Sequence, residues 1–164
     1  MALSQSAREN GWMSYPADLW NERKPCPVGP HRFWVHCIEK YGGPILEVAC
    51  GNGRWLIPLA ERSPGYEVVG VDINSEFIAT ARRHVEERRA DGVDLDATFL
   101  VGDIVHLDLG RTFPLAIMTS WTFCVLLTQD DQIAFLERVR EHLRPGGAFA
   151  FNLCVPSWRH RGSR

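Results

Sequence analysis

Short apolar runs of strand length alternate along the chain with segments whose apolar residues recur at helical spacing. The short runs predict five strands: one beginning at Ile45, and then residues 67–72, 97–104, 113–120 and 148–154. The helical spacing predicts helices over residues 31–41, 55–61, 74–91 and 128–143, with Asn74 and Thr128 placed to cap the last two.

Strands that alternate with helices predict parallel strands joined by crossover helices. We therefore expect an α/β fold with a doubly wound, mostly parallel sheet between two layers of helices. Residues 1–10 are polar and are expected to fray. Prolines and glycines between residues 25 and 30 are expected to stop any helix before residue 31.

The stretch from Ile45 to Glu61 is the point around which the domain is organised. An apolar strand carries Glu47 near its end, small residues and two glycines follow, and an apolar pattern resumes at Trp55. A glycine turn that leads into a helix is typical of nucleotide sites in open α/β sheets. Leu56 stands where a dinucleotide fingerprint needs its third glycine, so a nicotinamide oxidoreductase is disfavoured. Glu47 suits a cationic ligand better than a pyrophosphate.

Acidic residues also end the second and third predicted strands. Asp72 lies 21 residues beyond Gly51, about the spacing at which a carboxylate meets ribose hydroxyls in such folds. The alternative for Asp72 is an incidental part in capping the helix that starts near Asn74. Asp103 follows Gly102 at the end of the third strand. Three consecutive predicted strands thus end in an acidic residue, namely Glu47, Asp72 and Asp103. Turn formation alone hardly explains this pattern.

These motifs resemble those of the class I S-adenosylmethionine-dependent methyltransferases. Glu47, Gly51 and Gly53 match the family's first motif, with Ala49 where its first glycine most often stands. The Gly70–Asp72 and Gly102–Asp103 pairs and the Leu-Arg-Pro-Gly-Gly run at 143–147 extend the resemblance over residues 44–154. The resemblance implies a Rossmann-like sheet of strand order 3-2-1-4-5, without the family's final two antiparallel strands.

The resemblance also implies which residues hold S-adenosylmethionine. Glu47 would place the methionine end, and the turn would approach it through Ala49, Cys50, Gly51 and Gly53. Asp72 would bind the ribose, with Ile73 against the base. Asp103 would accept a hydrogen bond from the adenine amino group, and Ile104 would touch the ring.

The acceptor side is less defined. Ser120, Trp121 and Phe123 follow the fourth strand where the family faces the transferable methyl group, although packing would explain Trp121 equally well. The Asn/Asp-Pro-Pro-aromatic run of many DNA and glutamine methyltransferases and the Pro-Cys of cytosine-C5 enzymes are missing there. Residues 1–30 are expected to form a lid, with Tyr15 or Trp20 on the ligand, or a hydrophobic anchor, which we favour. No residue stands out as a catalytic base.

Composition narrows the function little. The 164 residues are 45% hydrophobic and 23% charged, with a net charge of −2, which gives no reason to expect nucleic acid or a membrane as partner. There is no membrane-length apolar run and no signal peptide, so a cytoplasmic protein is expected. The five cysteines lack metal-ligand spacing, predict buried reduced thiols and give no metal site.

The sequence thus predicts an S-adenosylmethionine-dependent methyltransferase domain at 31–156 that acts on a small molecule, followed by a basic tail at 157–164. The alternative is a non-catalytic module that binds S-adenosylmethionine or a partner chain on a degenerate fold. The apolar fifth strand, residues 149–154, would be an exposed sheet edge. We therefore expect a homodimer through that edge, or a fragment of a longer protein.

Overall fold

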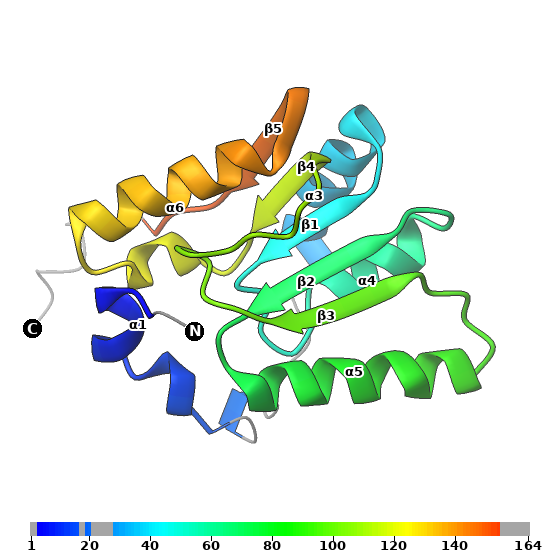
Figure 1. Ribbon diagram of the computed structural model, residues 1–164. Helices are drawn as coiled ribbons and strands as arrows, with labels where there is room; N and C mark the ends of the chain where they lie inside the picture. The colour runs from blue at the N-terminus through cyan, green and yellow to red at the C-terminus, as the bar shows by residue number, and fades with distance from the viewer. Residues whose placement is uncertain (1–2, 17–18, 21–27, 155–164) are drawn as a thin grey trace, which may run out of the picture.

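A five-stranded parallel sheet forms the centre of the protein, as the sequence predicts. The computed structural model describes residues 3–16, 19–20 and 28–154. The strand order is β3-β2-β1-β4-β5, and all four neighbouring pairs are parallel (Figure 1). The strands are β1 (Ile45–Val48), β2 (Val68–Asp72), β3 (Ala97–Val101), β4 (Phe113–Met118) and β5 (Leu143–Phe151).

Helices cover both faces of the sheet, which confirms the predicted three layers. One apolar core joins one face to α3 (Val28–Tyr41), α4 (Leu56–Arg62) and α5 (Ser75–Ala90). The other core joins the opposite face to α6 (Gln129–Glu141) and to the loop after β3. Ile45 belongs to the first core and Leu46 to the second, because successive strand residues point to opposite faces. Both faces of the central strands are therefore apolar.

The predicted caps are present on the two long helices. The Asn74 side chain accepts hydrogen bonds from the backbone N–H groups of Glu76 and Phe77 at the start of α5. Thr128 accepts one from Asp131 at the start of α6. Each cap satisfies donors that have no partner within the helix.

Two predicted boundaries are wrong. Helix α3 begins at Val28, not at residue 31, so Gly29 and Pro30 lie in its first turn. Proline is tolerated there because its missing N–H would have no helical partner anyway. Strand β5 begins at Leu143, not at residue 148, so the Leu-Arg-Pro-Gly-Gly run at 143–147 lies inside it: pairing shifts from Phe113–Leu143 to Leu115–Ala148. The extra residues form an irregularity in the strand, with Gly146 at a φ of 78°.

The described residues at the N-terminus are ordered rather than frayed. Residues Gln5–Glu9 form α1, and Trp12–Ser14 form the 3₁₀ helix η1. Ser6 is 1% exposed, because this segment packs against the end of the sheet beneath α6 (Figure 1). The predicted basic tail at 157–164 lies outside the described residues, and the predicted domain limits stay predictions. None of the described helices is long and apolar enough to cross a membrane.

Candidate functional site

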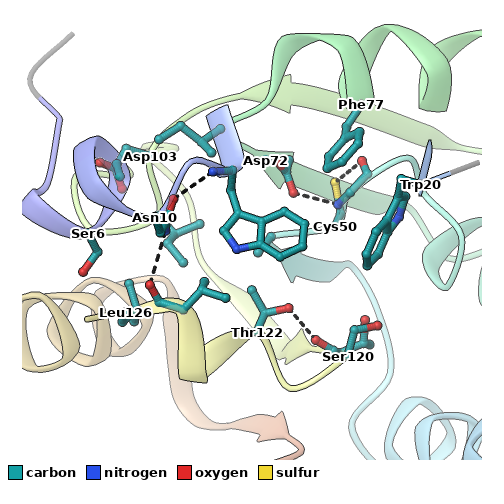
Figure 2. A pocket seen from close by; sticks show the side chains of 18 of the residues that line it. Ser6, Asn10, Trp20, Cys50, Asp72, Phe77, Asp103, Ser120, Thr122 and Leu126 are labelled. Carbon is teal, nitrogen blue, oxygen red and sulfur yellow. Dashed lines mark hydrogen bonds between the residues drawn. The ribbon is translucent and has the colours of Figure 1, made fainter. Parts of the chain in front are cut away.

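A pocket of about 880 Å³, including its open mouth, lies at the carboxyl ends of the strands. Figure 2 shows Asp103, Asp72 and Phe77 along one wall, and Leu126, Thr122 and Ser120 along the opposite wall. The N-terminal segment supplies further lining residues, so the pocket is built from the sheet and from the first residues of the chain.

The turn between β1 and α4 forms the floor and has a left-handed backbone. Ala49 has a φ of 57°, Gly51 a φ of 57° and Gly53 a φ of 76°. Ala49, Cys50 and Gly51 line the pocket. A Cβ on Gly53 would lie 2.8 Å from Ile57 and 3.0 Å from Phe99, so packing beneath the turn requires glycine there. The structure therefore brings the turn to the predicted place, with Gly53 beneath it.

Asp72 faces the pocket from the end of β2 and also holds the turn. Its Oδ2 accepts a hydrogen bond of 2.8 Å from the Gly51 N–H, and its Oδ1 accepts one of 2.9 Å from the Asn74 N–H. Burial raises the pKa of this carboxyl, while the N–H groups of Asn74, Gly51 and Ile73 act to lower it. Each oxygen keeps a lone pair for a further donor. The geometry is therefore compatible with both roles considered for Asp72, ribose binding and helix capping.

Asp103 occupies the matching position at the end of β3. Its Oδ1 accepts a hydrogen bond of 3.0 Å from the Val105 N–H, and its Oδ2 accepts one of 2.7 Å from the Ser4 N–H. It is 3% exposed and lines the pocket, together with Ile104 and Ile73. The predicted adenine-contacting residues are therefore gathered on one wall.

Glu47 does not line the pocket. Its side chain is fully buried, and Oε1 accepts a hydrogen bond of 2.8 Å from the Thr119 hydroxyl. Burial raises the pKa of Glu47 to about 8, and the charge of Asp72 adds to this rise. The Thr119 hydroxyl and the Leu56 N–H oppose it. Any effect of Glu47 on a ligand is therefore exerted from beneath the turn, and its predicted electrostatic part stays a prediction.

The four described cysteines are divided between the interior and the surface. Cys37 and Cys50 are buried, whereas Cys124 and Cys154 are exposed, so the expectation of uniformly buried thiols is wrong. Burial and the charges of Asp72 and Glu47 raise the pKa of the Cys50 thiol well above its usual range. Within the described part of the chain, no three His, Cys, Asp or Glu side chains group as metal ligands.

The segment after β4, which was predicted to face the acceptor, lines the pocket only in part. Ser120 lines it and accepts a hydrogen bond of 2.9 Å from the Trp55 indole N–H. Trp121 is 54% exposed, and neither it nor Phe123 lines the pocket. Phe123 packs instead against Phe135 and Phe151. Ser120 and Trp121 both have a φ of 60°, and these two left-handed residues change the direction of the chain after β4.

The N-terminal aromatic residues form a cluster beside the turn. Trp20 packs against Trp12, Tyr15 and Phe77, with ring centroids 5.7 to 6.4 Å apart. A Cβ on Gly51 would lie 3.4 Å from the Trp20 indole nitrogen. Trp20 lines the pocket and Tyr15 does not. The aromatic cluster therefore both anchors the segment and covers the turn.

Several residues that line the pocket were not predicted from the sequence. Arg54 directly follows the glycine turn, so its position could have been read from the motif. Thr122 and Leu126 lie within two or three residues of predicted pocket positions. Ser4, Ser6 and Asn10 could not be found, because nothing in a polar N-terminus indicates which distant side chains it contacts.

A left-handed turn after β1, with carboxylates at the ends of the next two strands in the sheet, β2 and β3, is typical of nucleotide sites in doubly wound α/β domains. Known proteins identify the family. Residues 45–147 match the family described as "Methyltransferase domain". The chain therefore belongs to the methyltransferase-domain family, as the motifs predict.

Individual relatives agree with this family. A Streptomyces cypemycin N-terminal methyltransferase is 33% identical over 74% of this chain and 46% of its own length. The Thermus thermophilus demethylmenaquinone methyltransferase is 31% identical over 84% of this chain and 56% of its own. The chain thus spans about half the length of these curated relatives.

Solved structures agree as well. The CcbJ methyltransferase of Streptomyces caelestis has a TM-score of 0.69 at 28% identity, over 82% of this chain and 54% of that one. The glycopeptide N-methyltransferase MtfA, solved with S-adenosylmethionine, has a TM-score of 0.65 at 29% identity, over 79% of this chain and 58% of that one. S-adenosylmethionine, the predicted cofactor, is thus the cofactor of this fold family.

Proposed function

We propose that this chain binds S-adenosylmethionine and transfers its methyl group to a small-molecule acceptor. The observation that carries the proposal is the placement of Asp72 and Asp103, two buried carboxylates on one wall of a pocket whose floor is the left-handed turn (Figure 2). This arrangement offers acceptors for ribose hydroxyls and for an exocyclic amine at separate points. The residues present therefore fit the cofactor.

The turn and Arg54 suit the methionine end. Ala49 and Gly51 bring backbone close to the ligand, since neither has a bulky side chain. Arg54 lines the same pocket, and a guanidinium can pair with the methionine carboxylate. We place the ribose at Asp72 and the adenine between Ile73 and Ile104 beside Asp103.

The bound cofactor supplies an electrophilic methyl group on a positive sulfonium. The chain itself holds the two partners in line and excludes water, and well-oriented reactions gain the equivalent of about 7–11 kcal/mol from such positioning. Among the described residues that line the pocket, none is a histidine. We infer that positioning dominates and that an amine acceptor would lose its proton to water.

The pocket and the relatives both support a small-molecule acceptor. The wall opposite the carboxylates carries the apolar Val125 and Leu126 and the hydroxyls of Ser120 and Thr122. Relatives include enzymes named for demethylmenaquinone, a dTDP-aminosugar and a glycopeptide. We propose an uncharged or amine-bearing organic acceptor, contacted by Trp20 and Ser120. The predicted lack of nucleic-acid partners and the cytoplasmic location stay predictions.

Titration calorimetry with S-adenosylhomocysteine tests cofactor binding, and we expect saturable binding. A methylation assay with a metabolite extract then follows formation of S-adenosylhomocysteine from S-adenosylmethionine. Binding with turnover supports the enzyme. Binding without turnover for any acceptor pool would support the non-catalytic module, and no binding would remove the proposal altogether.

A further inference from the structure

Hydrogen bonds fasten the N-terminal segment, which lines the pocket, at two places. The Ser6 N–H donates to Asp131 Oδ2 at 2.6 Å, and the Ser6 hydroxyl accepts from the Leu127 N–H at 2.7 Å. The Asn10 amide donates to the Val125 carbonyl at 3.2 Å. At the start of α5, the Asn74 amide donates to the carbonyls of Trp12 and Tyr15. The segment is therefore bound both to α5 and to the chain around α6.

Asp131 strengthens the attachment on the α6 side. Burial acts to raise the pKa of this carboxyl, but the hydrogen bonds from Ser6 and Thr128 outweigh burial and hold the pKa below its usual value. Asp131 is therefore ionised at neutral pH, and a charged acceptor strengthens the bond from Ser6. Residues Ser4–Ala7 are thus held in place whether or not Asp103 takes part.

The same segment reaches the carboxylate assigned to the adenine. The Ser4 N–H donates to Asp103 Oδ2 at 2.7 Å, across a separation of 99 residues in the chain. The Val105 N–H occupies one lone pair of Oδ1. With a backbone donor on each oxygen, the carboxylate is fixed in orientation and still has a lone pair on each oxygen for a ligand.

Ser4, Ser6 and Ala7 line the pocket beside Asp103 and Ile104. The residues of this wall are almost fully shielded from solvent: Ser4 is 4% exposed and Ser6 is 1% exposed. A ligand that reaches Asp103 must therefore lie against the N-terminal turn. A fixed carboxylate in such a place accepts hydrogen bonds and repels a carbonyl oxygen.

We propose that the turn Ser4–Ala7 forms part of the nucleobase subsite, and that the Ser4 N–H and the 6-amino group of the adenine share Asp103. This inference rests on the proposed function. Ser4 is a positioning residue: its N–H holds Asp103 in the orientation that selects an amino purine over a 6-oxo purine. The N-terminus thus sets the base specificity of a site whose motifs lie far along the chain.

The backbone of Ser4 allows a matched pair of variants. Its φ of −61° and ψ of 161° suit proline. Ser4→Pro removes the N–H that reaches Asp103 and also the hydroxyl that caps α1 through Ala7. Ser4→Ala removes only the hydroxyl. The difference between the two variants therefore reports the loss of the N–H, together with the proline ring carbon that replaces it beside Asp103.

Calorimetry with S-adenosylhomocysteine and S-inosylhomocysteine on the whole chain is the test. We expect the wild type and Ser4→Ala to prefer the adenosyl ligand by about tenfold or more, as for a lost charge-assisted hydrogen bond. Ser4→Pro should bind the adenosyl ligand about tenfold more weakly than Ser4→Ala does. Its preference for the adenosyl ligand over the inosyl ligand should also be smaller. Equal affinities and equal preferences in the two variants would overturn the inference.

Amide exchange in the wild type gives a second measurement that does not depend on the folding of a variant. Exchange of the Ser4 amide should slow further when S-adenosylhomocysteine saturates the protein, because the base covers the turn. An unchanged Ser4 rate at saturation would also overturn the inference. Failure of the wild type to bind S-adenosylhomocysteine at all would instead contradict the proposed function.

Discussion

Glu47 is a carboxyl group that the fold keeps from water. It lies beneath the turn with Thr119 as its hydrogen-bond donor, and its pKa is about 8 instead of the ordinary 4.5. The folded protein therefore binds a proton there that the unfolded chain releases near pH 4.5. Linkage then requires that stability falls as the pH rises from about 4.5 to about 8.

Glu47→Gln should remove that loss, because the amide keeps an acceptor for Thr119 and carries no charge. We expect the variant to match the wild type near pH 4.5 and to be more stable by about 1–3 kcal/mol near pH 8, as expected for a pKa shift of this direction. Urea unfolding at a series of pH values measures this. If stability depends on pH in the same way in both proteins, the pKa of Glu47 is not raised by folding.

Asp72 is the residue on which ribose binding depends in the proposed function. Asp72→Ala should weaken S-adenosylhomocysteine binding by more than about tenfold, because hydrogen bonds to a charged acceptor contribute roughly 1.5–3 kcal/mol. Calorimetry measures the affinity, and the melting temperature of the same samples reports the loss of the bonds to Gly51 and Asn74. A lower melting temperature with unchanged affinity would favour the capping role alone.

The turn between β1 and α4 acts as one element. Its backbone carries three left-handed residues in five, and the Gly51 N–H is tied to the end of β2. The turn therefore transmits the position of β2 to the floor of the pocket. Ala49, Cys50 and Gly51 are the residues of the turn that line the pocket, and their side chains are small or absent, so the path of the backbone determines the shape of the floor.

Gly51→Val should abolish cofactor binding. A branched side chain opposes a φ of 57° and would meet Trp20 above the turn. Ala49→Gly is the matched control: it should keep binding and remain as stable as the wild type, or gain up to about 1 kcal/mol, because glycine accepts the left-handed backbone. Calorimetry and thermal unfolding follow both variants. Tight binding by Gly51→Val would mean that the turn does not touch the ligand.

At the scale of the whole molecule, β3 and β5 are the two edge strands of the sheet among the described residues, and β5 is the more apolar edge near its end. Strand β5 pairs only with β4 there, and Phe149 stacks on Phe151, with ring centroids 4.9 Å apart. Phe151 is 36% exposed and Leu153 is 50% exposed. Arg144 and Pro145 lie at the start of β5, but residues 146–151 carry no charge, and an apolar edge of this kind invites pairing with another chain.

We propose that two copies associate through this edge. Sedimentation at increasing concentration should show a dimer, and Phe151→Glu should shift it to monomer by placing a charge on the edge. Glu137→Gln, on α6, serves as a control for a general effect of charge. A wild type that stays monomeric at high concentration, with the amides of 149–151 protected from exchange, would mean that another segment of the chain covers the edge.

The sequence by itself determined the parallel sheet and the edge of the sheet at which the candidate site lies. Alternating strands and helices predicted a parallel sheet but not its strand order. The order 3-2-1-4-5 came from the family resemblance, and the structure confirms it. Asp72 and Asp103 could be placed at the pocket because parallel strands end at the same edge of a sheet. These are local patterns, each read within a few residues of the side chain concerned.

Only the tertiary structure decided what surrounds those patterns. It placed Glu47 beneath the pocket instead of in it, and it set the 143–147 run inside β5, because pairing with β4 satisfies that backbone. It also ordered the polar N-terminus against Asp103 and Asp131, which lie 99 and 125 residues away from their partners in the chain. Contacts between residues so far apart in the chain produce no periodic pattern in the sequence. A serine N–H can be solvated in a frayed end or can donate to a buried carboxylate, and the residue type is the same in both cases.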